Sequence, residues 1–367
     1  MTDGARRYDF LDGLRGWAAV AVLFYHVFID GLPATTLMAD RELWARAFFL
    51  NGTLAVCIFF VVSGVSLSIR YLDTGDARGL ARIAAGRYLR LVLPIAAICA
   101  VAYLLMVTGT IPPAAQRPAP LGNYLQFAPT LEGLLTFSFV SVLFDYTDAA
   151  SYNPPLWTMS YEFFGSFLVF AMLAIARQWP LRQWLFVLVF VVLAAQQSLF
   201  ALFVGGIVIA EVYRQHERSP RLVLAGAALL AGGLALSVFL NLWFGLHYIM
   251  CAIALTAGVA FFPPARRLFE NRLARFLGRI SFPLYLVQAI VIYAFSVRGL
   301  DAAAALGWEP SMQRWAVGAV TIPLSFLCAM AFAPVNDLAV TLSRRFGAWC
   351  VARLPAFARQ PTARPVA

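Results

Sequence analysis

Hydrophobic residues gather along the chain in long runs separated by short polar connections. Ten of these runs approach the length at which a helix crosses a hydrocarbon core of about 30 Å. They are residues 12–30, 52–70, 91–109, 156–176, 183–197, 199–213, 222–240, 244–262, 281–297 and 315–334. Gln196 and Gln197 predict a tight turn between the two shortest runs. The pattern therefore predicts an all-α fold, a polytopic membrane helix bundle of about ten transmembrane helices.

Arginines are spread unevenly over the connections between these runs. One set of alternate connections holds only Arg41, Arg46, Arg117, Arg298 and Arg314. The other set is arginine-rich and includes both ends of the chain, at Arg6 and Arg7, 70–90, 177–182, 214–221, 266–279 and 344–364. Such connections stay in the cytoplasm, so both termini are predicted to be cytoplasmic. We expect a membrane domain over 1–343 and a basic, disordered cytoplasmic tail over 344–367.

Composition supports the membrane assignment and excludes other classes. Of the 367 residues 62% are hydrophobic and 13% charged, with a mean hydropathy of +0.77, whereas soluble domains carry about 25% charged residues. The net charge of +10 follows the predicted topology instead of forming a patch, so no nucleic-acid partner is expected. The five cysteines show no close Cys or His spacing, so neither a disulfide framework nor a metal site is predicted.

The first apolar run, Tyr8–Asp30, carries ionisable side chains at membrane depth, where they are costly and therefore suggest function. Arg15 and His26 are eleven residues apart, which places them on nearly the same helix face, about 16 Å apart along the axis. Asp30 lies four residues beyond His26, close enough to orient its ring, although it is equally a candidate interfacial cap. Arg15 belongs to an Asp-Gly-Leu-Arg-Gly sequence that begins at Asp12 and that we interpret as a turn.

Glu162 is a second ionisable residue within an apolar run. The segment from Asn153 enters the fourth run from the outside, so Glu162 lies about 10 Å inside it. His26 enters from the other side and reaches a similar depth in a core about 30 Å thick. A buried acid near a histidine is typical of a catalytic site, so we expect Glu162 to align His26. The alternative is that Glu162 faces water in a shallow vestibule.

Two small motifs complete the candidate residues. Arg87 and Arg90 stand three residues apart where the third run begins, and they either anchor the topology or clamp the phosphates of a cytosolic ligand. Ser63 and Gly64 lie in the middle of the second run, where a small pair favours close helix packing over a serine nucleophile.

The longest outer connection, 110–155, holds a shorter apolar run, Thr130–Phe144. A run of this length is more typical of a re-entrant or interfacial helix than of a spanning one. We expect it to cap an outward-facing cavity.

Five motifs in order resemble acyltransferase family 3, the bacterial integral-membrane O-acyltransferases. They are LDGLRGWAAVAVLFYH (11–26), FFVVSG (59–64), RYLRLVLP (87–94), NPPLWTMSYE (153–162) and GRISFPLYLVQ (278–288). The resemblance covers about 8–340. It implies a bacterial cytoplasmic (inner) membrane protein that takes an acyl group from acyl-CoA, usually acetyl-CoA, as substrate, with no permanently bound cofactor. The acceptor would be a hydroxyl of a glycan or other molecule at the outer face.

The resemblance also implies roles for individual residues. Gln288 stands where the family often has histidine, which leaves a hydrogen-bonding role but puts proton transfer there in doubt. The predicted catalytic residues are His26, Glu162 and Asp30. The predicted donor-binding residues are Arg15, Arg87, Arg90 and Asp12. The predicted acceptor-binding or structural residues are Trp157, Ser160, Ser63 and Gln288.

Our hypothesis is that His26 deprotonates the acceptor hydroxyl or takes the acyl group transiently. The alternative from another class is a transporter or flippase for a lipid-linked glycan, in which the same charges line a pathway. Transporters more often show paired repeats, and we find no internal repeat. The sequence leaves open the acceptor, the length of the acyl group and the oligomeric state.

Overall fold

The computed structural model of the protein describes residues 8–32, 43, 46–117, 121–216, 219–241 and 243–354. Within these ranges the chain forms helices and turns without a strand, which confirms the all-α fold class. Six helical segments of this part are long and apolar enough to cross a membrane. They are Gly52–Thr74, Ala77–Val107, Pro154–Gln178, Pro220–Ser237, Arg272–Ala305 and Pro310–Ala352.

Each predicted apolar run coincides with a helix. The helices are α1 (Asp9–Phe24) continued by the π-helix η1 (Tyr25–Gly31), α4 (Gly52–Thr74), α5 (Ala77–Val107), α8 (Thr158–Ile175), α9 (Arg182–Ala195), α10 (Phe200–His216), α11 (Pro220–Ser237), α12 (Leu246–Phe261), α14 (Arg272–Val291) continued by η9 (Ile292–Ser296) and α15 (Val297–Ala305), and α16 (Pro310–Ala352). That all ten cross the membrane, with both termini in the cytoplasm, stays a prediction.

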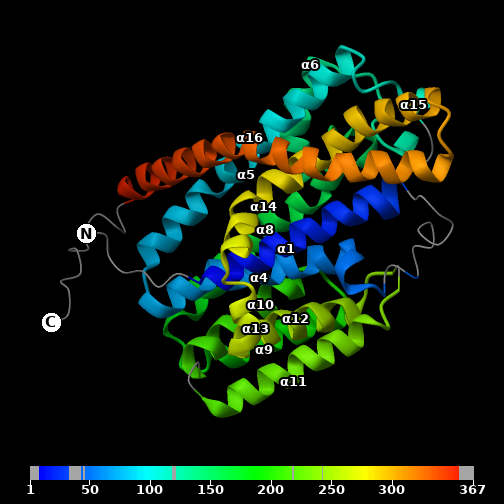
Figure 1. Ribbon diagram of the computed structural model, residues 1–367. Helices are drawn as coiled ribbons and strands as arrows, with labels where there is room; N and C mark the ends of the chain where they lie inside the picture. Colours follow the sequence, from blue (N-terminus) through cyan, green and yellow to red (C-terminus); the bar gives the residue numbers. More distant parts are fainter. Residues whose placement is uncertain are drawn as a thin grey trace.

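In Figure 1 α11 lies along the lower edge of the bundle and α16 crosses its upper part below α6 and α15, with α1 and α14 between α16 and α11. Two large apolar clusters hold it together. One joins α4, α10 and α12. The other joins the end of α1 to α5, α14 and the segment between α5 and α8. The helices that carry the predicted site residues, α1, α4, α5, α8 and α14, therefore meet in the middle of the bundle.

The Asp-Gly-Leu-Arg-Gly sequence forms the first turns of α1, so our interpretation of it as a turn is wrong. Its glycines serve close packing instead. A Cβ on Gly16 would lie 2.5 Å from the backbone nitrogen of Gly278 in α14, and a Cβ on Gly278 would overlap the carbonyl oxygen of Asp12. This close approach brings the charged start of α1 against α14.

Helix α16 passes the predicted domain boundary at 343 and continues to Ala352, so the first part of the expected tail is helical. The reason is packing against α5: a Cβ on Gly86 would overlap the backbone of Ser343, and a Cβ on Gly347 would overlap that of Arg82. The rest of the predicted tail, 355–367, lies outside the described residues, as do Arg6, Arg7, Arg41 and Arg218.

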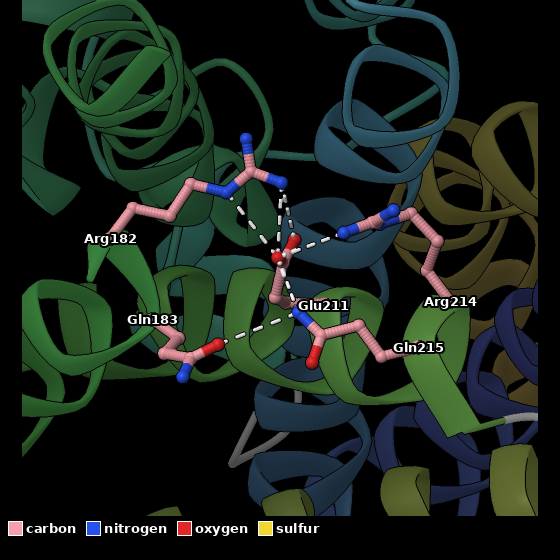
Figure 2. A network of polar contacts seen from close by, with 5 residues as sticks. All are labelled: Arg182, Gln183, Glu211, Arg214 and Gln215. Atoms are coloured by element: carbon pink, nitrogen blue, oxygen red, sulfur yellow. Dashed lines mark hydrogen bonds and ion pairs between the residues drawn. The ribbon is translucent and has the colours of Figure 1, made fainter. Parts of the chain in front are cut away.

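The two short helices α9 and α10 are joined as predicted. Gln197, in the turn, has a φ of +53°, in the left-handed region. At the other end of the pair the buried carboxylate of Glu211 accepts hydrogen bonds from Arg182 at 3.0 Å, Arg214 at 3.1 Å and Gln215 at 2.7 Å (Figure 2). Two arginines thus compensate a carboxylate that would be costly to bury alone.

The apolar run in the connection between α5 and α8 is a continuous helical stretch of α6 (Leu131–Thr136), η5 (Phe137–Ser141) and α7 (Val142–Phe144). The Thr130 hydroxyl caps its start by accepting a hydrogen bond from the Gly133 amide at 3.0 Å. The stretch is apolar but falls among the helices too short to span by length. Whether it is re-entrant or interfacial stays a prediction.

Candidate functional site

Two polar cavities lie within the bundle. The first, which we call the arginine cavity, has a volume of about 420 Å³ and lies between α1, α4, α5, α8 and α14. Its charged lining residues are Asp12, Arg15, Arg87, Arg90, Glu162 and Arg279. The second, the histidine cavity, has a volume of about 650 Å³ and is lined by His26 and Asp30 together with Trp157 and Ser160. The structure thus divides the predicted site residues other than Gln288 between two chambers.

Glu162 and Arg87 form the central ion pair of the arginine cavity. Ser63 Oγ donates a hydrogen bond to Glu162 Oε1 at 2.9 Å. Arg87 Nε donates to Ser166 Oγ at 2.8 Å, and Ser166 Oγ donates to the carbonyl oxygen of Glu162 at 2.5 Å. Two nitrogens of the Arg87 guanidinium are therefore engaged within the protein. That Arg87 and Arg90 together clamp a phosphate stays a prediction.

Ser63 and Gly64 have separate roles. Gly64 packs as predicted, since a Cβ there would overlap the carbonyl oxygen of Phe203 in α10. Ser63 faces the cavity and bonds Glu162. From the sequence, Ser63 and Gly64 were predicted to form one packing pair, and the hydrogen bond from Ser63 to Glu162 was not predicted.

The arginine cavity also holds polar groups without a partner in the described part of the chain. Arg90 lies over the ring of Phe282 at 5.0 Å, but its Nη1 atom makes no hydrogen bond. The same holds for Ser66 Oγ and Asn336 Oδ1, which also line the cavity. Buried polar groups normally find partners, so this lining fits a polar ligand or solvent. Arg15 lies 3.9 Å from Asp12.

His26 and Asp30 lie side by side in the π-helix η1, with His26 Nδ1 3.4 Å from Asp30 Oδ2. The predicted i, i+4 contact is therefore present. The remaining polar and aromatic lining of the histidine cavity includes Tyr124, Tyr146, Asp148, Tyr161 and Tyr293.

A hydrogen-bonded cluster joins the lining of one cavity to the lining of the other. The Tyr285 hydroxyl of α14 lies 2.6 Å from Thr158 Oγ1 and donates a hydrogen bond to the carbonyl oxygen of Pro155. Tyr285 and Thr158 line the arginine cavity, whereas Pro155 lines the histidine cavity. We call these three residues the partition.

The expected alignment of His26 by Glu162 is not seen in this structure, because the two residues line different cavities. Glu162 and Thr158 share a face of α8 and line the arginine cavity, while Ser160 and Trp157 line the histidine cavity. Similar depth in the membrane is therefore not the same as proximity. The partner of Glu162 is Arg87, and the neighbour of His26 is Asp30.

Gln288 is fully buried and lines neither cavity. Within the described residues neither its amide oxygen nor its amide nitrogen has a hydrogen-bond partner. The hydrogen-bonding role expected for Gln288 is not seen in this structure.

Arg117 is a residue that sequence reasoning placed only as an outer charge. Its guanidinium is buried and donates hydrogen bonds to the carbonyl oxygens of Leu121 at 2.7 Å and Tyr124 at 2.6 Å. It also lies 5.5 Å from the centre of the Tyr293 ring. Burial lowers the pKa of Arg117. Leu121, Tyr124 and Tyr293 line the histidine cavity, so Arg117 fixes part of its wall.

The fold and the two chambers define a multi-pass helical membrane protein with a polar site inside the bundle. A family model described as an acyltransferase domain matches residues 8–330, and the chain belongs to this family, acyltransferase family 3. The match spans every motif on which the resemblance rests. No curated protein and no solved structure matches the chain significantly.

Proposed function

We propose that the protein transfers an acyl group from cytoplasmic acyl-CoA, with acetyl-CoA as the first candidate, to a hydroxyl of a cell-envelope or extracellular glycan. The observation that carries the proposal is the pair of chambers on either side of the partition. The arginine-lined chamber suits an anionic donor, and the chamber with a histidine suits proton transfer from a hydroxyl. Membership of an acyltransferase family favours this function over the transporter alternative.

His26 is the general base in this proposal. With Nδ1 directed at Asp30, the other ring nitrogen, Nε2, is available to accept a proton in the histidine cavity. Asp30 would hold the tautomer with its proton on Nδ1 and stabilise the imidazolium that forms, the usual role of a carboxylate beside a catalytic histidine.

The transfer then takes place in two bond changes. The acceptor hydroxyl gives its proton to His26 Nε2 while its oxygen bonds to the thioester carbonyl carbon. The tetrahedral centre then breaks its carbon–sulfur bond, and the imidazolium returns the proton to the departing thiolate. The products are an ester and the free thiol of CoA. Transient transfer of the acyl group to His26 stays an alternative route to the same products.

Glu162 takes a positioning role in this scheme. It neutralises Arg87 and holds Ser63, which fixes the wall of the arginine cavity beside the partition. Arg15 and Arg90 are the candidate contacts to the donor, because both line the arginine cavity. The Nη1 atom of Arg90 also makes no hydrogen bond to the described residues. The partition must open, or the pantetheine arm must pass beside it, for the thioester to meet His26.

The test uses inverted membranes that contain the full chain at matched abundance, incubated with labelled acetyl-CoA. We expect label to enter the glycan fraction as an alkali-labile ester, and His26→Ala to abolish this incorporation. His247→Ala is the matched control, because His247 lines neither cavity. Full transfer by the His26→Ala variant would refute the role of His26. Glycan movement across the membrane without acylation would favour transport instead.

The acceptor is sought by comparing a deletion strain with its parent. NMR spectra of the envelope polysaccharides should show ester signals in the parent that disappear in the deletion strain and return on complementation. Unchanged ester signals in every envelope polysaccharide would argue against a glycan acceptor.

A further inference from the structure

A third cavity of about 630 Å³ opens beside the arginine cavity. We call it the mouth cavity. Its charged lining consists of Arg272, Arg275, Arg279, Arg344, Asp12 and Asp337. None of the four arginines was among the predicted donor-binding residues, and the proposed function has not used the cavity.

Two helices position these side chains. On α14, Arg272, Arg275 and Arg279 are spaced by three and four residues, which places them on one helix face. On α16, Asp337 and Arg344 are seven residues apart and also share a face. Helices α14 and α16 pack against each other, so both faces border one space.

The mouth cavity is continuous with the arginine cavity, because Asp12, Gly278 and Arg279 line both. At this shared boundary α1 packs closely on α14, because a Cβ on Gly278 would overlap the carbonyl oxygen of Asp12. A ligand with one end at Arg272 and Arg344 therefore has a polar route toward Arg90 and the partition.

The arginines of the mouth cavity have fewer protein partners than Arg87 and can therefore bind a ligand more readily. Arg87 is held by Glu162 and Ser166. Arg275 lies 3.3 Å from Asp9, but Arg272, Arg279 and Arg344 form no ion pair within the described ranges. Together the two connected cavities present seven arginines and three carboxylates, an excess of four positive charges. Such an excess in a concave site attracts polyanions.

We propose that the mouth cavity binds the phosphorylated nucleotide end of the acyl-CoA donor, while the arginine cavity receives the pantetheine arm. The inference rests on the proposed function. Guanidinium groups bind phosphate oxygens through paired hydrogen bonds, and a phosphate monoester carries about two negative charges at neutral pH. A phospholipid headgroup offers the same phosphate chemistry, but the continuity with the arginine cavity favours a ligand that extends inward.

The first test is direct binding, which needs no acceptor. The full chain in nanodiscs made of a neutral phospholipid is titrated with CoA and with adenosine 3′,5′-bisphosphate, which carries phosphate but lacks the pantetheine arm. We expect both to bind the wild type, and Arg272→Gln/Arg344→Gln to weaken CoA binding at least ~10-fold, which corresponds to about 1.4 kcal/mol. The matched control is Arg267→Gln/Arg345→Gln, which removes two exposed arginines that line none of the three cavities.

The second test separates the nucleotide from the reacting end of the donor. With acetyl-CoA the Arg272→Gln/Arg344→Gln variant should show a raised KM and an unchanged kcat. With S-acetylpantetheine, which lacks the nucleotide, the variant and the wild type should share one KM. Wild-type binding of CoA should also weaken as salt rises, a measurement that does not depend on any variant folding.

The outcomes distinguish the two proposals. If the wild type transfers acetyl groups from acetyl-CoA but Arg272→Gln/Arg344→Gln keeps the wild-type affinity for CoA, the mouth cavity is not the nucleotide site. If that variant instead loses only copurified anionic lipid, the cavity binds headgroups and the inference is wrong. If the wild type transfers nothing from acetyl-CoA to any envelope fraction, the proposed function itself fails.

Discussion

Arg87 and Glu162, which are 75 residues apart in sequence, form an ion pair in the wall of the arginine cavity. Their side chains are only 11% and 16% exposed. Removing one partner of a buried pair leaves the other charge uncompensated and typically costs about 3–5 kcal/mol. The pair therefore has two contributions: it stabilises the packing of α5 against α8, and it shapes the wall of the arginine cavity.

The first prediction separates these two contributions. Arg87→Gln and Glu162→Gln should each lower the thermal unfolding temperature of the purified protein, because each leaves a buried charge without its partner. The double variant Arg87→Gln/Glu162→Gln should recover much of the loss, since no net charge stays behind. Acyl transfer should stay low in the double variant. Additive destabilisation by the two substitutions would show that the pair is not coupled.

A second prediction concerns the neighbours His26 and Asp30. Asp30→Asn keeps the size of the side chain but removes the charge that would stabilise a protonated His26. General-base catalysis contributes about 10²–10⁴-fold, and we expect Asp30→Asn to lose part of this factor in kcat with little change in the KM for acetyl-CoA. Asp148→Asn is the control, because Asp148 lines the same cavity without contacting His26. Equal losses in both variants would mean that Asp30 acts only through the charge of the cavity.

A third prediction addresses the partition. Tyr285→Phe removes the hydroxyl that joins α14 to Thr158 and to the carbonyl of Pro155. With the chambers less well separated, water in the histidine cavity should reach the thioester more often. We expect a higher ratio of acetyl-CoA hydrolysis to acyl transfer, measured as released CoA thiol against labelled ester. Tyr103→Phe is the control, since Tyr103 lines neither chamber. An unchanged ratio would show that this hydroxyl is not needed for separation.

Helical periodicity predicted the parts of the site that lie on one helix. Arg15 and His26 were expected on one face of the first span, and both face polar cavities. The contact of His26 with Asp30 follows from their spacing of four residues. The turn at Gln196 and Gln197 followed from two amides between apolar runs. These relationships are local, so the sequence carries them directly.

Helical periodicity does not predict which residues of different helices come into contact. The position of Glu162 along its helix predicted a depth similar to that of His26. The side chain of Glu162 instead faces Arg87, because of the rotation of α8 about its axis. Tyr285 carried no signal apart from its place in a motif, because its role depends on contacts with Thr158 and Pro155, which are distant in the sequence. The arginines of α14 and α16 were interpreted as topology anchors, and only the packing of these two helices brings them around one cavity.

The last prediction concerns Gln288, whose buried amide has no partner in the part of the chain that the structure describes. A buried polar group left unpaired costs about 1–3 kcal/mol, so Gln288→Leu should preserve or raise the unfolding temperature. Because Gln288 lines neither chamber, acyl transfer by this variant should stay within about twofold of the wild type, a change worth less than 0.5 kcal/mol. Gln288→Glu is the informative contrast, since an uncompensated charge at the same buried position should destabilise the protein strongly. Loss of transfer by Gln288→Leu at an unchanged unfolding temperature would instead assign the amide a direct part in the reaction.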